Sequence, residues 1–122
     1  MNATEPEIAL VTGASRGIGR AIALALAATG RHVAINYRAN AEAAQETLRR
    51  VQAAGGTGEL APFDVADRDA TERAVQDLLQ RHGRIDVLVN NAGIRKDMLL
   101  VWTEPQDWHE VLDTHLTGFY HV

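Results

Sequence analysis

The chain has 122 residues, no cysteine and a formal net charge of -4, and 46% of its residues are hydrophobic. This length allows one domain of ordinary globular composition, while the missing cysteines exclude disulfides, thiolate metal sites and cysteine nucleophiles. The acidic charge balance argues against a nucleic-acid partner. No apolar run reaches the about 18–20 residues of a membrane span, and the polar start of the chain does not resemble a signal peptide. We therefore expect a cytoplasmic protein without nucleic-acid or membrane partners.

The first half of the chain predicts two strands, each followed by a helix. Residues 8–12 and 32–37 are apolar runs of strand length. After the first run, apolar residues recur at helical spacing: Ile18, Ala21, Ile22, Ala25 and Leu26. Gly30 ends this predicted helix, since glycine readily adopts the left-handed conformation that closes a helix. Asn40 is the expected N-cap of the second helix, which runs to about Ala54.

The second half repeats this alternation. Residues 57–63 predict a third strand, and residues 85–90 predict a fourth. Between them, Asp67 is expected to cap a helix that Gly83 ends. Thr103 is followed by a glutamine at capping-box spacing, and an amphipathic helix is predicted behind it.

The order βαβαβαβα predicts an α/β fold of the Rossmann type. Strands that alternate with helices form a doubly wound parallel sheet through right-handed crossovers. We expect residues 1–122 to form the N-terminal part of one dinucleotide-binding domain. The fourth strand would then lie at an unpaired edge of the sheet.

A glycine-rich turn lies between the first strand and the first helix. It reads Thr12-Gly13-Ala14-Ser15-Arg16-Gly17-Ile18-Gly19. Glycines let the backbone turn tightly and approach a ligand, and the N–H groups at a helix start attract phosphate. The strand–turn–helix context therefore predicts a site for a dinucleotide pyrophosphate. A purely structural turn is the alternative.

The end of the second predicted strand indicates which dinucleotide binds. An NAD site normally has an acidic residue there, which accepts hydrogen bonds from the ribose. This strand ends Asn36-Tyr37-Arg38 instead. Because a guanidinium binds the 2′-phosphate of NADP with charge-assisted hydrogen bonds, the sequence predicts NADP(H), held by Arg38, Arg16 and Ser15. The alternative is that both arginines are solvated surface charges.

Two motifs resemble signatures of the short-chain dehydrogenase/reductase family. One is the Thr-Gly-x-x-x-Gly-x-Gly turn, and the other is Asn90-Asn91-Ala92-Gly93 after the fourth predicted strand. Residues 90–99 and 108–119 are most similar to the 3-oxoacyl-[acyl-carrier-protein] reductase branch, and the resemblance covers nearly the whole chain. It implies reduction of a 3-oxoacyl thioester to the 3-hydroxyacyl form with NADPH, in fatty-acid, polyketide or aryl-polyene synthesis.

The resemblance also implies site residues and partners. The cofactor-binding residues would be Gly13, Ser15, Arg16, Gly17, Ile18, Gly19, Tyr37, Arg38, Asp64, Val65, Asn90, Ala92 and Gly93. Asp64 would accept a hydrogen bond from the adenine amino group, with helix capping as its competing role. Asn90 and its neighbours would brace the sheet and line the nicotinamide-ribose side, with a structural Asn-Gly turn as the alternative. An acyl-carrier-protein-linked substrate and a homo-oligomer, commonly a tetramer, are the implied partners.

The serine and the Tyr-x-x-x-Lys motif that catalyse the family's reaction have no match in this sequence. Ser15 belongs to the phosphate turn, Lys96 has an alanine four residues before it, and Tyr120 lies too near the end to have a partner lysine. We expect these residues after position 122, so the chain alone is predicted to be inactive. His115 stands where the family has a proton-relay asparagine, and it could relay protons or be purely structural.

Two other functions stay open. One is a non-catalytic dinucleotide-binding or interaction module that is complete at this length, and the other is a reductase of a different ketone or alcohol. The remaining histidines show no metal-ligand spacing, so we interpret them as surface residues and predict no metal site. They are His32, His82, His109 and His121.

Overall fold

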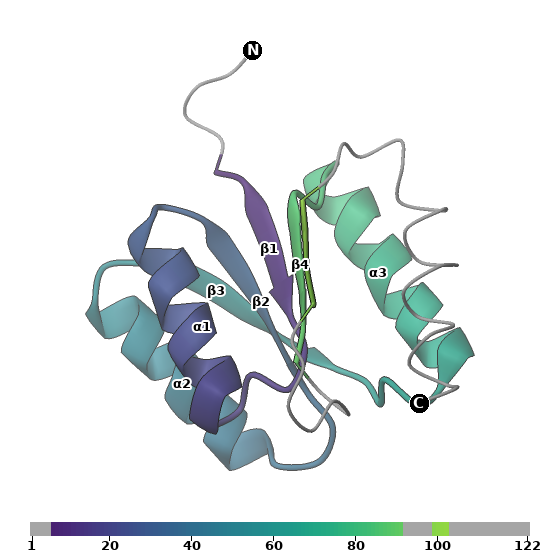
Figure 1. Ribbon diagram of the computed structural model, residues 1–122, viewed down its shortest axis with the longest axis horizontal. Coiled ribbons are helices and arrows are strands. Elements are labelled where there is room, and N and C mark those ends of the chain that lie inside the picture. The colour runs from purple at the N-terminus through teal and green to yellow at the C-terminus, as the bar shows by residue number, and fades with distance from the viewer. Residues whose placement is uncertain (1–5, 92–98, 103–122) are drawn as a thin grey trace.

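A computed structural model describes residues 6–91 and 99–102 and shows a sheet with helices on both faces (Figure 1). The elements are β1 (Ile8–Val11), α1 (Gly17–Ala28), β2 (His32–Tyr37), α2 (Ala41–Ala53), β3 (Thr57–Pro62), α3 (Arg68–His82), β4 (Val87–Asn90) and β5 (Leu99–Trp102). The strand order is β3-β2-β1-β4-β5, and β1 to β4 are mutually parallel. This is the predicted Rossmann-type arrangement.

The sheet has two cores because helices cover both of its faces. Ala9 and Val11 of β1 pack in the core on the side of α1 and α2. Ile8 and Leu10 of the same strand belong to the second core, on the side of α3. Since consecutive side chains point to opposite faces, a strand covered on both sides is apolar at every position. That is why the run at residues 8–12 predicted a strand correctly.

The structure corrects the prediction that β4 lies at an unpaired edge of the sheet. β5 pairs antiparallel with β4, with Val87 opposite Trp102 and Asn90 opposite Leu99. No element was expected at residues 99–102, although a short run of leucine, valine and tryptophan favours a strand. The exposed edge of β4 offers such a run backbone hydrogen-bonding groups. The helix predicted behind Thr103 lies outside the described residues.

The predicted helix ends are confirmed. Asn40 Oδ1 accepts a hydrogen bond of 3.0 Å from the backbone N–H of Ala43, and Asp67 Oδ1 accepts one of 3.0 Å from Ala70. Gly30 and Gly83 follow α1 and α3 with φ angles of 93° and 79°. None of the helices in the described part of the chain combines the length and the apolar character needed to cross a membrane.

The buried stripe of α1 differs from the predicted one. Ile18 is 65% exposed, and the alanines expected beside it at positions 21 and 25 are also exposed. Gly19, Ala23 and Ala27 are buried instead. These small residues follow one another at i, i+4 and i+8, so they lie on one helix face and let α1 pack close to the sheet. The larger Ile22 and Leu26 pack at the border of this contact, partly buried.

Candidate functional site

A pocket of about 490 Å³ lies where the chain leaves the carboxyl ends of β1, β2 and β3. Ligands of open α/β sheets bind at this end of the strands. The lining includes predicted cofactor residues from all three connections: Gly13, Ser15, Arg16, Tyr37, Arg38, Asp64 and Val65. The fold therefore brings together residues that are up to 52 positions apart in the sequence, since Gly13 and Val65 both line the pocket.

Those of the other predicted site residues that the structure describes do not line this pocket. Gly17 and Ile18 are exposed at the start of α1, and Gly19 is buried against the turn. Asn90 is buried at the end of β4, and its Oδ1 has no hydrogen-bond partner among the described residues. Ala92, Gly93 and His115 lie outside the described residues.

Two glycines of the turn adopt a backbone conformation that other residues avoid. Gly13 and Gly17 have φ angles of 62° and 61°, in the left-handed region that glycine enters without steric cost. A Cβ built on Gly17 would have no atom of the described residues within 4 Å. The left-handed conformation of Gly17 therefore serves an open face of the turn rather than close packing against the described residues.

The start of α1 differs electrostatically from the starts of α2 and α3. Arg16 at the N-cap position makes no side-chain capping hydrogen bond, and the first turn of α1 holds no acidic residue. Asn40 and Asp67 cap the other two helices, and each of those has an acid in its first turn. The N–H groups and positive dipole end of α1 thus have no capping side chain and no acid in their own turn, which suits a phosphate.

Asn36 holds the three connections around the pocket together, a role that sequence reasoning missed. Its Oδ1 accepts a hydrogen bond of 3.0 Å from Gly13 N–H. Its Nδ2 donates to the carbonyl oxygens of Ala61 and Phe63 at 3.0 and 2.9 Å. A polar residue inside an apolar run predicted to be a strand was the available signal, because a buried amide needs partners.

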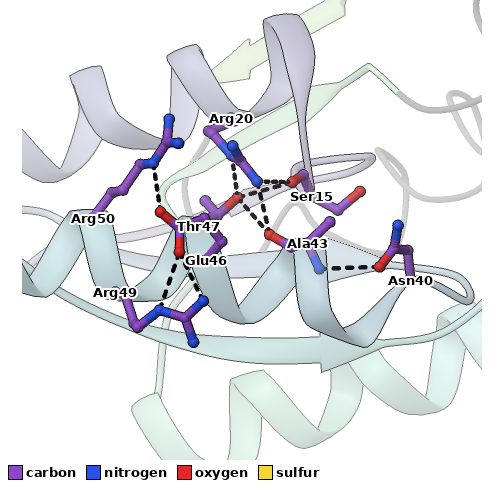
Figure 2. A network of polar contacts seen from close by, with 8 residues as sticks. All are labelled: Ser15, Arg20, Asn40, Ala43, Glu46, Thr47, Arg49 and Arg50. Carbon is purple, nitrogen blue, oxygen red and sulfur yellow. Dashed lines mark hydrogen bonds and ion pairs between the residues drawn. The ribbon is translucent and has the colours of Figure 1, made fainter.

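Arg20 and Thr47 anchor the glycine turn to α2 (Figure 2). Arg20 Nη2 donates to the carbonyl oxygens of Ser15 and Ala43 at 2.6 and 2.9 Å, and its Nε donates to Thr47 Oγ1 at 2.9 Å. The Thr47 hydroxyl, which is fully buried, donates to the Ala14 carbonyl oxygen at 2.9 Å. These contacts fix the turn from behind and leave its front open. Periodicity in the sequence did not indicate them.

The second motif contacts the glycine turn from β4. Asn91 N–H donates to Thr12 Oγ1 at 2.9 Å, and Asn91 Nδ2 donates to the Gly13 carbonyl oxygen at 3.2 Å. The two motifs on which the family resemblance rests are therefore one hydrogen-bonded unit. The first glycine of the turn is held from β2 and from β4 at once.

Opposite charges meet at the mouth of the pocket. Arg38 Nε lies 3.8 Å from Asp64 Oδ2, and the Arg38 side chain is 78% exposed. Asp64 Oδ1 accepts a hydrogen bond of 2.9 Å from Ala66 N–H, while Asp67 caps α3. An exposed ion pair of this length contributes little free energy. The Arg38 guanidinium is therefore able to move to an anionic ligand.

The interpretation of His32 and His82 as surface residues is wrong. Both are half-buried, their ring centroids lie 5.0 Å apart, and both Nε2 atoms approach Glu59 Oε2, at 2.8 and 2.7 Å. Burial raises the pKa of Glu59, but hydrogen bonds from Arg81, His32 and His82 outweigh burial and lower the pKa from 4.5 to about 2. Sequence spacing hides this cluster because β2, β3 and α3 meet only in the fold. His109 and His121 lie outside the described residues.

Comparison with known sequences gives one family. A family model described as short chain dehydrogenase matches residues 7–122. A 3-oxoacyl-[acyl-carrier-protein] reductase of Synechocystis sp. is 46% identical over 120 residues, which are 98% of this chain and 49% of that protein. The chain spans about half the length of the curated relatives it matches.

Solved structures are similar in the same region. A metagenomic short-chain oxidoreductase in complex with NADP has a TM-score of 0.70 and 42% identity, covering 75% of this chain and 42% of that one. A short chain dehydrogenase from Burkholderia cenocepacia J2315 in complex with NADP has a TM-score of 0.68 and 46% identity, covering 76% of this chain and 38% of that one.

Proposed function

The chain belongs to the short-chain dehydrogenase family, and from this premise we propose that it forms the NADP(H)-binding half of a 3-oxoacyl-[acyl-carrier-protein] reductase. When bound, the cofactor supplies the hydride that converts the ketone of a 3-oxoacyl thioester to an alcohol. The relatives named as 3-oxoacyl-[acyl-carrier-protein] reductases support the choice of substrate. An acyl-carrier-protein-linked substrate, a homo-oligomer and a cytoplasmic setting are parts of the same proposal.

The observation that carries the cofactor proposal is the pocket itself. It joins an uncapped helix start to the residues after β2, where Arg38 stands in place of an acid. The pyrophosphate would bind the N–H groups at the start of α1. The 2′-phosphate would bind Arg38, Arg16 and Ser15, whose cationic and hydroxyl groups complement its charge.

The adenine and the nicotinamide would lie on opposite sides of the glycine turn. We propose that Asp64 accepts a hydrogen bond from the adenine amino group, because its carboxylate lies in the pocket beside Val65. On the other side, Asn90 and the residues after it would line the nicotinamide ribose. Asn90 Oδ1, buried and without a partner among the described residues, is an acceptor suited to such a polar ligand.

The proton donor for the reduction would come from elsewhere in the protein. The 122 residues contain no Tyr-x-x-x-Lys motif, and a missing general acid costs about 10²- to 10⁴-fold in rate. We propose that these residues bind and orient the cofactor but do not turn over substrate on their own. His115, at the family's asparagine position, would contribute at most to proton relay.

Cofactor titration tests the proposal. We expect NADPH to bind more tightly than NADH, and Arg38→Ala to weaken NADPH binding roughly 10- to 100-fold, the cost of charge-assisted hydrogen bonds, without changing NADH binding. Arg73→Ala is the matched control, because Arg73 is exposed on α3, away from the pocket lining. Equal affinity of the unaltered chain for both cofactors would contradict the 2′-phosphate assignment.

The substrate is tested separately with the full-length protein. We expect NADPH oxidation with a 3-oxoacyl thioester and much slower oxidation with simple ketones. Turnover by residues 1–122 alone would contradict the proposed division between binding and catalysis. Cofactor binding without turnover of any ketone by the full-length protein would identify a non-catalytic binding module instead.

A further inference from the structure

The amino end of the sheet carries a cluster of two imidazoles and one carboxylate. His32 begins β2, Glu59 lies in β3, and His82 ends α3. The three potential ligand atoms all lie within 4.8 Å of one another. We propose that His32, Glu59 and His82 bind one divalent transition-metal ion of the Zn²⁺ type, which joins two strands and a helix. This site is independent of the proposed reductase function, since the cofactor pocket lies at the opposite end of β2 and β3.

The distances suit a small tetrahedral ion. The Nε2 atoms of His32 and His82 lie 2.8 and 2.7 Å from Glu59 Oε2. Zinc takes imidazole nitrogen and carboxylate oxygen at about 2.0–2.2 Å, so its ligand atoms stand about 3.3 Å apart. The two nitrogen–oxygen distances need to widen by only about half an ångström. The imidazoles favour Zn²⁺ and its neighbours over Mg²⁺ or Ca²⁺, which prefer oxygen ligands.

Thr57 prepares His32 for this role. Its hydroxyl oxygen lies 3.0 Å from His32 Nδ1. Without a metal, Nε2–H of His32 donates to Glu59; with a metal bound, the proton would move to Nδ1 and donate to the Thr57 oxygen, which leaves the Nε2 lone pair for the ion. Metal-binding histidines commonly have such a partner on the second ring nitrogen.

Two neighbouring arginines would repel a cation if they were not already paired. Arg81 Nη2 donates to Glu59 Oε1 at 2.5 Å, and its Nε donates to Asp77 Oδ2 at 2.9 Å. Arg84 Nη2 pairs with Asp86 Oδ1 at 2.6 Å. Each guanidinium thus has a carboxylate of its own outside the cluster. Because Arg81 contacts Oε1, the Oε2 atom that faces the histidines stays available to an ion.

Space for the remaining ligand lies beside the imidazoles. A pocket of about 330 Å³ is lined by Pro6, Ile8, His32, Arg81, His82 and Arg84. A zinc ion with three protein ligands takes water as its fourth. The pocket gives that water access from solvent, and it lets the ion enter without unfolding of α3.

The test titrates chelator-treated full-length protein with Zn²⁺, and in parallel with Co²⁺ as a spectroscopic probe. We expect one ion per chain, visible absorption bands of Co²⁺ in a site of low coordination number, and a higher Tm with Zn²⁺. His32→Gln and His82→Gln should each abolish this binding. Thr57→Val should weaken it roughly 10-fold, as the loss of a partner behind a metal ligand does.

Glu46→Gln is the matched control. Glu46 is also held by two arginines, Arg49 and Arg50, but neither of the two described histidines, His32 and His82, contacts it. Metal affinity should therefore be unchanged in this variant. NADPH affinity should be unchanged in the histidine variants, which separates failure of the metal site from failure of the proposed function.

Imidazole NMR resonances of the unaltered protein give a measurement that needs no variant. Zn²⁺ should shift the resonances of His32 and His82 and leave those of the other three histidines among these 122 residues unchanged. Absence of stoichiometric binding would overturn the proposal. Equal binding by the two histidine variants, or shifts at other histidines, would overturn it as well.

Discussion

The two ends of the sheet form polar sites in different ways. At the carboxyl end, the pocket is made of backbone N–H groups, glycines and exposed arginines, and its parts are spread around an open space. At the amino end, the Nε2 atoms of His32 and His82 both already lie within hydrogen-bond distance of Glu59 Oε2. The first arrangement suits a large anion that brings its own charge, whereas the second suits a small cation. One sheet thus presents opposite electrostatic preferences at its two ends.

The largest effect is expected at the carboxyl end, from Gly19→Ala. A Cβ at Gly19 would lie 2.0 Å from the Gly13 carbonyl oxygen, a backbone atom that cannot move away freely. We expect a loss of about 3 kcal/mol of unfolding free energy, the upper range for overpacking, and loss of NADPH binding. Urea denaturation and cofactor titration measure the two effects.

Gly17→Ala is the comparison within the same turn. Gly17 has a positive φ but open space around it, so alanine there should cost only about 1–2 kcal/mol of conformational strain. A larger cost at Gly17 than at Gly19 would show that close packing is not what holds the turn. Metal binding at the amino end should be unchanged in both variants, as long as they fold.

Thr47→Val tests whether the hydrogen bonds that hold the glycine turn against α2 also affect cofactor binding in the pocket. The variant keeps the shape of the side chain but removes a buried hydroxyl, which leaves the Ala14 carbonyl oxygen without this donor. We expect about 2 kcal/mol lower stability and weaker NADPH binding, because an unsatisfied buried polar group is costly and the turn loosens. Unfolding curves and cofactor affinity check this, and unchanged affinity would confine the role of Thr47 to stability.

The contacts of Asn36 and Thr47 also show where sequence reasoning ends. The strands, the caps at Asn40 and Asp67, and the glycine turn depend on neighbours in the chain, so residue order predicts them. The partners of Asn36 are the backbone of β3 and the turn, and no local pattern names such distant partners. The buried stripe of α1 was missed for a related reason. Its residues are small so that the helix can pack close to the sheet, and a search for large apolar residues does not find them.

The same contrast between local and long-range contacts explains why the sequence predicted the cofactor pocket but not the histidine cluster. Residues 12–19 form the glycine turn almost alone, so a motif reveals it. The histidine cluster joins residues separated by 27 and 23 positions, and it exists only because β3 lies beside β2 and α3 ends nearby. β5 likewise depends on the edge of β4, which periodicity does not describe.

Lowering the pH should reduce the stability of the chelator-treated protein through Glu59, at the amino end of the sheet. Because the pKa of Glu59 is lower in the folded state than its ordinary value, this residue stabilises the fold above about pH 4.5, and the stabilisation is lost as pH falls toward 2. Allowing for contact with water, we expect about 1–2 kcal/mol. Glu59→Gln should remove this part of the pH dependence, measured by unfolding between pH 7 and pH 3. An unchanged pH profile would contradict the coupling of Glu59 to its three partners.

The smallest effect is expected from Glu46→Gln, measured by thermal unfolding at low and high salt. Glu46 and its arginines lie on α2 (Figure 2), where the hydrogen bonds from Arg50 and Arg49 lower the pKa of Glu46 although its side chain is partly exposed. Water and salt screen such contacts, so the variant should unfold at nearly the same temperature at both salt concentrations. Glu59 receives hydrogen bonds of similar length but is shielded by two imidazoles. If Glu46→Gln lowered the Tm as much as Glu59→Gln does, ion pairs with arginine would be sufficient to explain the stabilisation by Glu59. The contacts of Glu59 with the two imidazoles would then add nothing.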